Sequence, residues 1–231
     1  MTSQVKNSKR IFCALILGVL SLSTFTANAQ WRVGASGGAD YNWFTINKQY
    51  QNNYHYAGAW GWNAAVFGQY NFKNWLGLRF ELEASERNHR FYRDGIYENT
   101  NYVNRNTYLH LPVMTQFSFG GEKVRGFVHT GIYAGYWLAG RQVGTYFEPL
   151  SEETMKLNIS YDFQSEKDQR WDFGLVGGIG IEFLLAEHWA MHIESRCYYS
   201  FISTVKHYME PVKDNRYNTT LGIQAGFSYI F

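Results

Sequence analysis

The sequence is short of residues that cross-link a chain or interrupt regular structure, since its 231 residues include only two cysteines and three prolines. Cys13 lies in the first 29 residues, so a mature chain without them keeps Cys197 alone and forms no internal disulfide. Charged residues are also few, at 17%, and the 21 Lys and Arg nearly balance the 19 Asp and Glu. A chain without a basic excess lacks the compositional sign of nucleic-acid binding.

Long apolar runs are equally scarce, and the one near the N-terminus is too short for a transmembrane helix of about 20 residues. It spans residues 11–22, follows three cations and precedes the small residues 27–29. This order predicts a secretory signal peptide over residues 1–29, with the mature chain starting at Gln30. Its removal leaves 18 basic against 19 acidic residues, so the mature chain is almost neutral.

Aromatic residues are what the chain has in excess. It contains 18 Tyr, 17 Phe and 8 Trp, although its mean hydropathy is only -0.36. A soluble domain with one closed core rarely holds so many rings, so we expect many of them on the surface.

Alternation with a period of two residues recurs after Gln30, whereas no segment there has the pattern of a long amphipathic helix. It is clearest at the C-terminus, where Leu221 and Ile223 share an apolar face while Gly222 and Gln224 share a small or polar one. Eight such segments predict eight strands, at residues 31–43, 60–72, 75–91, 107–119, 124–141, 170–184, 189–202 and 217–231.

The predicted connections alternate strictly between short and long. Turns at 73–74, 120–123 and 186–188 alternate with polar segments at 44–59, 92–106, 142–169 and 203–216. Turns on one rim and loops on the other are typical of an outer-membrane barrel. Because an unpaired backbone group in hydrocarbon costs several kcal/mol, a spanning sheet must close on itself.

We therefore predict an all-β fold over residues 30–231, in the outer membrane of a Gram-negative cell. It is a closed eight-stranded antiparallel transmembrane β-barrel, with short periplasmic turns and long extracellular loops. Tryptophans near the predicted strand ends suit its interfacial girdles. They are Trp31, Trp43, Trp75, Trp137, Trp171 and Trp189.

The C-terminus and the outer face each predict a partner. Phe227, Tyr229 and Phe231 alternate at period two and resemble the C-terminal signal that the barrel assembly machinery reads. The apolar outer face predicts contact with outer-membrane lipid, including lipopolysaccharide.

Four segments resemble those of a known family: residues 108–112 (YLHLP), 131–140 (GIYAGYWLAG), 172–183 (DFGLVGGIGIEF) and 194–199 (ESRCYY). In them the chain is similar to the PorT-type outer-membrane β-barrels common in Bacteroidetes. The resemblance covers most of the mature chain and implies a small integral barrel. For PorT itself it implies participation in protein secretion across the outer membrane. The family typically has an acid where this chain has His110.

Charged residues fall on the face predicted to line the lumen. On one strand, Arg79, Glu81, Glu83 and Arg87 project inward, and successive inward positions are about 6.8 Å apart. Paired carboxylates can serve acid–base chemistry or a cation path. An eight-stranded lumen is narrow enough for side chains to fill, which favours a structural network. The predicted network comprises Arg79, Glu81, Glu83, Arg87, Arg125, Asp172, Glu182, His192, Glu194 and Arg196.

Three histidines, His110, His129 and His192, also face inward in this prediction, with Glu182 near His192 across the last periplasmic turn. No CxxC, HxH or HExxH spacing accompanies them. We therefore predict no metal ion, no cofactor and no catalytic residue, and interpret the histidines as hydrogen-bonded lumen groups.

These patterns favour a non-enzymatic scaffold or secretion-associated component that contacts other envelope proteins through its rim and extracellular loops. Aromatic residues in the loops suit recognition or merely prolong the barrel wall, and residues 142–169 suit a lid or docking element. One alternative is a narrow ion or small-solute channel. Another is a lipid A-modifying enzyme that uses Ser200, Ser203, His207 or His55 at the extracellular rim.

Overall fold

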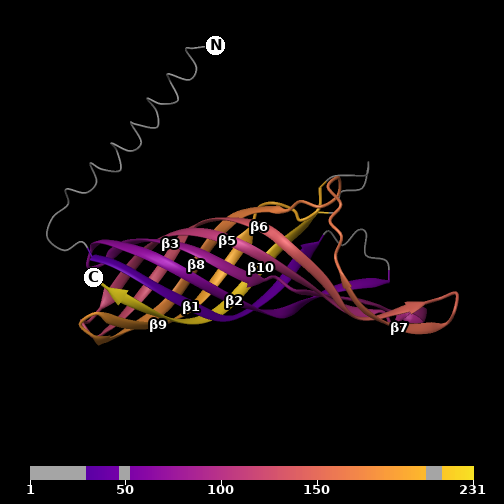
Figure 1. Cartoon of the computed structure of the whole chain (residues 1–231), viewed down its shortest axis with the longest axis horizontal. Coiled ribbons are helices and arrows are strands. Elements are labelled where there is room, and N and C mark those ends of the chain that lie inside the picture. The colour runs from indigo at the N-terminus through magenta and orange to yellow at the C-terminus, as the bar shows by residue number, and fades with distance from the viewer. Residues whose placement is uncertain (1–29, 47–52, 207–214) are drawn as a thin grey trace, which may run out of the picture.

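The protein folds into a ring of eight antiparallel strands, with two further strands at one end (Figure 1). The computed structural model describes residues 30–46, 53–206 and 215–231, so the predicted signal peptide lies outside the described residues. The elements are β1 (Gln30–Ile46), β2 (Tyr54–Lys73), β3 (Leu76–Glu86), β4 (His89–Arg93), the 3-10 helix η3 (Gly95–Tyr97), β5 (Asn101–Gly120), β6 (Val124–Glu148), β7 (Glu153–Ser160), β8 (Trp171–Ala186), β9 (Trp189–Ser200) and β10 (Arg216–Ile230).

Closure of the ring depends on its first and last strands. The order is β1, β2, β3, β5, β6, β8, β9 and β10, and all neighbours are antiparallel. β10 returns to β1 along its whole length, from Arg32 opposite Ile230 to Ile46 opposite Arg216. Every strand of the ring has a partner on both sides, which confirms the predicted closed barrel. Within the described residues, no helix has the length and apolar character needed to cross a membrane.

The two faces of the barrel wall have opposite character. In β9, His192, Glu194 and Arg196 are buried in the lumen, whereas Ile193 is 49% exposed on the outside. β8 repeats the pattern, with Ile179 65% exposed. An apolar exterior around a charged interior is the inverse of a soluble fold and suits a lipid solvent.

Aromatic side chains mark both margins of this apolar exterior. Figure 1 shows the C-terminus at one end of the barrel and β7 projecting from the other. Exposed tryptophans lie toward each end, as expected for rings at the two membrane interfaces. Trp31, Trp75 and Trp189 lie near the end with the short turns, and Trp60 and Trp171 lie toward the end with the long connections.

Several strands continue beyond their predicted bounds at the end with the long connections. β2 begins at Tyr54 and β5 at Asn101, inside segments predicted as loops. The segment 142–169, predicted as one irregular connection, is mostly a hairpin, because β6 runs to Glu148 and then pairs with β7. The prediction interpreted these polar segments as loops. Their β-branched and aromatic residues instead continue the pairing of the strands.

The predicted strand over residues 75–91 is instead divided in two. Arg87 and Asn88 interrupt it, and β4 then continues along the same line between β2 and β5. Both interrupting side chains are buried. Arg87 pairs with Asp172 across the lumen, whereas Asn88 donates to the backbone carbonyl of Trp60 and accepts from the backbone N–H of Asn106.

An arginine in place of Ile179 tests which face meets lipid. Ile179 lies near the middle of β8 on the outer face. We expect Ile179→Arg to lower the free energy of unfolding by about 2 to 4 kcal/mol, because a cation at mid-membrane loses its hydration. The measurement is equilibrium denaturation of the mature barrel in lipid vesicles, followed by tryptophan fluorescence.

Leu150→Arg is the matched control, because Leu150 is 96% exposed in the turn between β6 and β7. We expect it to change the free energy of unfolding by less than about 0.5 kcal/mol. Equal losses in both variants would contradict the assignment of the outer face to lipid. The adjacent Gly178 is unsuitable, since a Cβ there would lie 2.5 Å from Glu194 Oε1.

Candidate functional site

A cluster of ionisable side chains crosses the middle of the lumen. Arg196 donates to both oxygens of Glu81 at 2.6 and 3.0 Å, and to Glu194 at 3.0 Å. It also donates to Glu83 at 3.3 Å, while Arg79 forms a second ion pair with Glu81. Arg196 belongs to β9 and two of its carboxylate partners to β3, which is four strands away in either direction around the ring. One guanidinium therefore joins opposite walls.

Further side chains from β5, β6 and β9 bond to this cluster. His129 Nδ1 lies 2.8 Å from Glu194, and its Nε2 lies 2.7 Å from Gln116 Oε1. The hydroxyl of Tyr198 donates to Glu83 at 2.6 Å. These groups are all buried, so the cluster is hydrogen-bonded on several sides as burial of charge requires.

A second layer lies nearer the long connections and centres on Arg87. Its guanidinium pairs with Asp172 on β8 and donates to the hydroxyl of Tyr133 at 3.2 Å. The guanidinium carbon also lies 4.9 to 5.6 Å from the ring centres of Tyr108, Tyr133 and Tyr198. The cation is thus held by one carboxylate and three electron-rich rings.

Stacked rings close the lumen beside this layer. Tyr108 stacks on His110 and on Trp137, with ring centres 5.5 and 5.9 Å apart. Trp137 then stacks on Tyr161 at 5.4 Å. The prediction that placed Trp137 in an interfacial girdle is wrong, because it is only 8% exposed. Trp137 lies eight residues after His129 on β6, and an even separation along a strand places both side chains on the inward face.

Glycines on the inner face make room for these side chains. A Cβ on Gly180 would lie 2.4 Å from the ring of Phe127, and one on Gly226 would lie 2.5 Å from His192 Cε1. Large side chains therefore fill the space that neighbouring strands leave open. The lumen is a packed interior, as expected for a barrel of eight strands.

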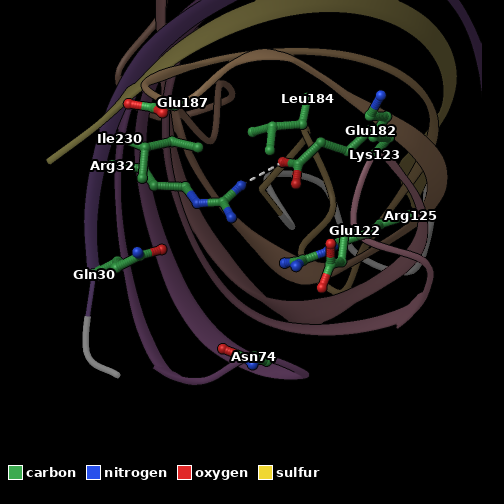
Figure 2. A pocket seen from close by; sticks show the side chains of 10 residues that line it. All are labelled: Gln30, Arg32, Asn74, Glu122, Lys123, Arg125, Glu182, Leu184, Glu187 and Ile230. Atoms are coloured by element: carbon green, nitrogen blue, oxygen red, sulfur yellow. Dashed lines mark hydrogen bonds and ion pairs between the residues drawn. The ribbon is translucent and has the colours of Figure 1, made fainter. Parts of the chain in front are cut away.

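A charged pocket of about 200 Å³ opens at the end with the short turns (Figure 2). Arg32 donates to Glu182 at 2.6 Å, which joins β1 to β8 across the mouth. Figure 2 also shows Arg125 reaching into the pocket. Its Nε donates to the carbonyl oxygen of Gly121 at 3.2 Å, and no ion pair is found for it among the described residues. Arg125 is thus placed at the edge of the predicted network.

His192 is likewise separate from the ion pairs. It lies opposite Glu182 in the register of β8 and β9, as predicted. Glu182 nevertheless bonds to Arg32, and the His192 ring packs against Phe67 and Phe127 with centres 5.6 and 6.2 Å away. Its position is that of a packed lumen side chain.

A second pocket, of about 230 Å³, lies at the end with the long connections. His89 forms part of its wall, 4.1 Å from the ring centre of Phe44, with Nδ1 3.3 Å from Asn106 Nδ2. β4 lies beyond the exposed Trp60 and hence outside the membrane-spanning segments. Burial, helped by the nearby Arg216, lowers the pKa of His89 to about 3. The ring is therefore neutral at physiological pH and accepts from Asn106.

Sequence comparison assigns the family. The profile of the outer membrane protein beta-barrel domain matches residues 9–206. The chain belongs to this family. Its place is accordingly the outer membrane of a Gram-negative cell, and the end with the short turns faces the periplasm. Comparison with curated protein sequences gives no match.

Solved structures share the fold of this outer-membrane barrel. The outer membrane protein OprG from Pseudomonas aeruginosa is 13% identical, with 87% of this chain and 95% of that chain covered and a TM-score of 0.51. Neisserial surface protein A is 12% identical, with 87% and 98% covered and a TM-score of 0.45. At such identities the likeness concerns the fold alone.

The residues of the enzymatic alternative are not assembled in the described part of the chain. Ser200 donates to Asp172, His55 lies 2.5 Å from Asp94, and Ser203 donates to the carbonyl oxygen of Val205. His207 lies outside the described residues.

One buried Ser–His contact does occur, between Ser85 Oγ and His110 Nδ1 at 3.2 Å. Glu83 approaches the same ring nitrogen at 3.7 Å, so a relay through both nitrogens is not formed. All three residues are buried and closed to substrate. In the described residues, no group of three or more His, Cys, Asp or Glu is placed to hold a metal ion.

Sequence reasoning missed a layer of amide side chains. Asn63 donates to Asp40 at 2.6 Å. Asn42 donates to Asn218 at 3.2 Å and accepts from Thr220 at 2.7 Å. These residues alternate at period two on the inward faces of β1, β2 and β10, and that spacing is the signal that identifies them.

Removal of Arg196 tests the central cluster. We expect Arg196→Met to lower the free energy of unfolding by about 3 to 5 kcal/mol, because it leaves buried carboxylates without their cation. Adding Glu81→Gln and Glu194→Gln to the same chain should restore part of the loss. The measurement is denaturant unfolding of the refolded mature barrel at neutral pH.

Arg105→Met is the control for the loss of one cation, since Arg105 is exposed on β5 outside the membrane-spanning part. We expect it to change stability by less than about 0.5 kcal/mol. If Arg196→Met were as mild as this control, the cluster would contribute nothing to holding the barrel together.

The buried His89 predicts a pH dependence. Its pKa is near 6.5 in the unfolded chain and about 3 in the fold, so protonation favours unfolding as pH falls from 6.5 toward 3. The stability supplied by this group is complete above pH 6.5 and declines by up to about 1.4 kcal/mol per pH unit below it. His89→Gln should lose less stability than the native chain between pH 7 and pH 4.5 in denaturant titrations. Parallel losses would show that His89 is not the titrating group.

Proposed function

We propose that this protein is a closed, non-enzymatic barrel that acts as a scaffold or docking component through its extracellular end. The filled lumen is the observation that carries this proposal. Arg196 joins β9 to the opposite β3, Arg87 joins the β3 side to Asp172, and Arg32 joins β1 to Glu182. Side chains that cross the lumen at three levels leave no open path for a solute. Interactions with other molecules then take place at the ends of the barrel.

The extracellular end offers the more developed surface. β2, β4, β5, β6 and β7 all extend beyond the aromatic margin. Phe91 stacks on Tyr54 and Tyr102 there, with ring centres 6.0 and 4.9 Å apart. Such contacts stiffen the projecting sheet, and a rigid surface binds a partner at a lower entropic cost.

The PorT-type resemblance supports a secretion-associated role as the specific form of this function. Other envelope proteins, lipopolysaccharide and the barrel assembly machinery are the partners that such a role implies. The family's usual acid is replaced by His110, which here bonds to Ser85 inside the packed lumen. Residues 1–29 serve in this proposal as the signal peptide that directs the chain to the cell envelope.

Planar bilayers test the closed lumen. The purified mature chain is expected to give no ohmic single-channel current at neutral pH. A variant with Arg32→Ala, Arg87→Ala, Arg196→Ala and Glu81→Ala removes the crossing side chains at all three levels and should give small, ion-permeable events. A gel control verifies that each protein is folded: an unheated sample in detergent should migrate as a folded barrel, at a different position from a heated sample.

Regular currents from the native chain would overturn the closed-barrel proposal and favour the narrow channel. The absence of current from both proteins, when both are folded, would also contradict the closed-barrel proposal. The crossing side chains would then not be what closes the lumen.

A further inference from the structure

Among the described strands, β7 is the one that pairs on a single side along its whole length, and its other edge is open outside the barrel wall. β7 pairs with β6 from Glu148 opposite Glu153 to Arg141 opposite Ser160, and no strand of the described chain pairs on its other side. All its residues except Leu157 are exposed. Figure 1 shows this hairpin projecting from the end of the barrel opposite the C-terminus. An open edge of eight residues is a template for a further strand.

The direction of the free backbone groups follows from one hydrogen bond. Tyr161, the residue after β7, continues the register and donates its backbone N–H to Gly140 O at 2.8 Å. Because backbone groups alternate in direction along a strand, the odd-numbered residues of β7 also turn their N–H and C=O groups toward β6. Thr154, Lys156, Asn158 and Ser160 then turn theirs outward. The edge thus presents four N–H and four C=O groups in one line.

This edge is complementary to itself. Suppose that two copies pair in antiparallel fashion with Leu157 opposite Leu157. Residues whose backbone N–H and C=O groups point away from β6 then lie opposite such residues of the other copy, so the two edges can form hydrogen bonds. Lys156 then lies opposite Asn158, and Met155 lies opposite Ile159 on the other face. The alternative register that centres on Lys156 would place two lysines opposite each other, which is unfavourable.

We propose that β7 pairs with β7 of a second copy of this chain and so joins two barrels by their extracellular ends. The two-fold axis of an antiparallel pair is perpendicular to the strands, and β7 projects away from the barrel end. The second barrel therefore points the opposite way, and the pair connects two facing membranes. This inference rests on the proposed role of the extracellular end and names its partner.

Apolar side chains give the pairing its driving force. Met155 and Ile159 are 46% and 52% exposed although they stand outside the membrane. Pairing would cover them against each other and satisfy eight backbone groups on each copy. One such strand pair buries much less surface area than a standard protein–protein interface, so a single contact is weak. Many copies on two facing membranes would strengthen the attachment by avidity.

Cross-linking between lipid nanodiscs tests the register. Nanodiscs with one mature barrel each leave both membrane faces accessible, and Cys197→Ser removes the native thiol. In that background Leu157→Cys is expected to form disulfide-linked pairs, since residues opposite each other at a non-hydrogen-bonded position have Cα atoms close enough for a disulfide. Lys156→Cys is the matched control, because the proposed register sets it against Asn158. We expect about tenfold more linked product from Leu157→Cys.

Proline substitution tests the backbone hydrogen bonds. Lys156→Pro removes an outward N–H without touching the pairing with β6, whereas Lys156→Ala removes the same charge and keeps the N–H. Pairing of discs, measured by light scattering, is expected to persist in Lys156→Ala and to fall about tenfold in Lys156→Pro. Electron microscopy should show the pairs stacked face to face.

Equal cross-linking at positions 156 and 157, pairing that survives Lys156→Pro, or discs joined edge to edge would each overturn the proposal. Discs that stay monodisperse would also overturn the proposal. The β7 edge would then be available to pair with a strand of a different protein. Channel currents from the native chain would refute the closed lumen without altering disc pairing, so the two proposals fail separately.

Discussion

One constraint underlies the whole structure: inside a bilayer a backbone N–H or C=O has no water to bind, so it must bind another strand. β10 meets β1 over its full length for this reason, and the sheet has no edge within the apolar exterior. Closure with eight strands in turn fixes the width of the interior at what side chains from the two walls can span. Arg196 reaches Glu81 on the opposite strand because of that narrow width. The inner glycines follow from it as well, since a ring such as Phe127 needs the space over Gly180.

The buried charges are best understood as determinants of register. A buried ion pair does not by itself guarantee stability, because apolar side chains could fill the same space. An apolar lumen, however, would leave each strand apolar on both faces and remove the difference that tells lipid side from lumen side. With Glu81, Glu83 and Arg196 in place, a slip of one residue would turn polar groups that are hydrogen-bonded in the lumen into hydrocarbon. The cluster therefore selects one arrangement of the strands among several that could close.

Period-two alternation was enough to predict the ring, its faces and the inward position of nearly every charged residue named for the lumen. Partners could not be predicted, because they depend on the stagger of strands far apart in the sequence. Glu182 lies opposite His192, as the alternation predicts, but its hydrogen-bonding partner is Arg32 across the mouth. Trp137 shows a different error, since its residue type was given more weight than its place in the alternation. The extension of β6 to Glu148 was missed because the segment after Arg141 has the polar composition of a connection.

Beyond the aromatic margin the governing constraint disappears, and the architecture changes with it. Water can satisfy backbone groups there, so an unpaired edge that would be prohibitive in hydrocarbon is tolerated along β7. β6 shows the transition within one strand: it lies between β5 and β8 in the membrane, and between β5 and the single-sided β7 outside it. The same chain thus has a closed part, in which each strand pairs on both sides, and an open part in which the outer edge of β7 has no partner strand among the described residues. Binding by backbone pairing is available only to the second, and this is why the projecting hairpin, rather than the charged lumen, is where a partner can be recognised.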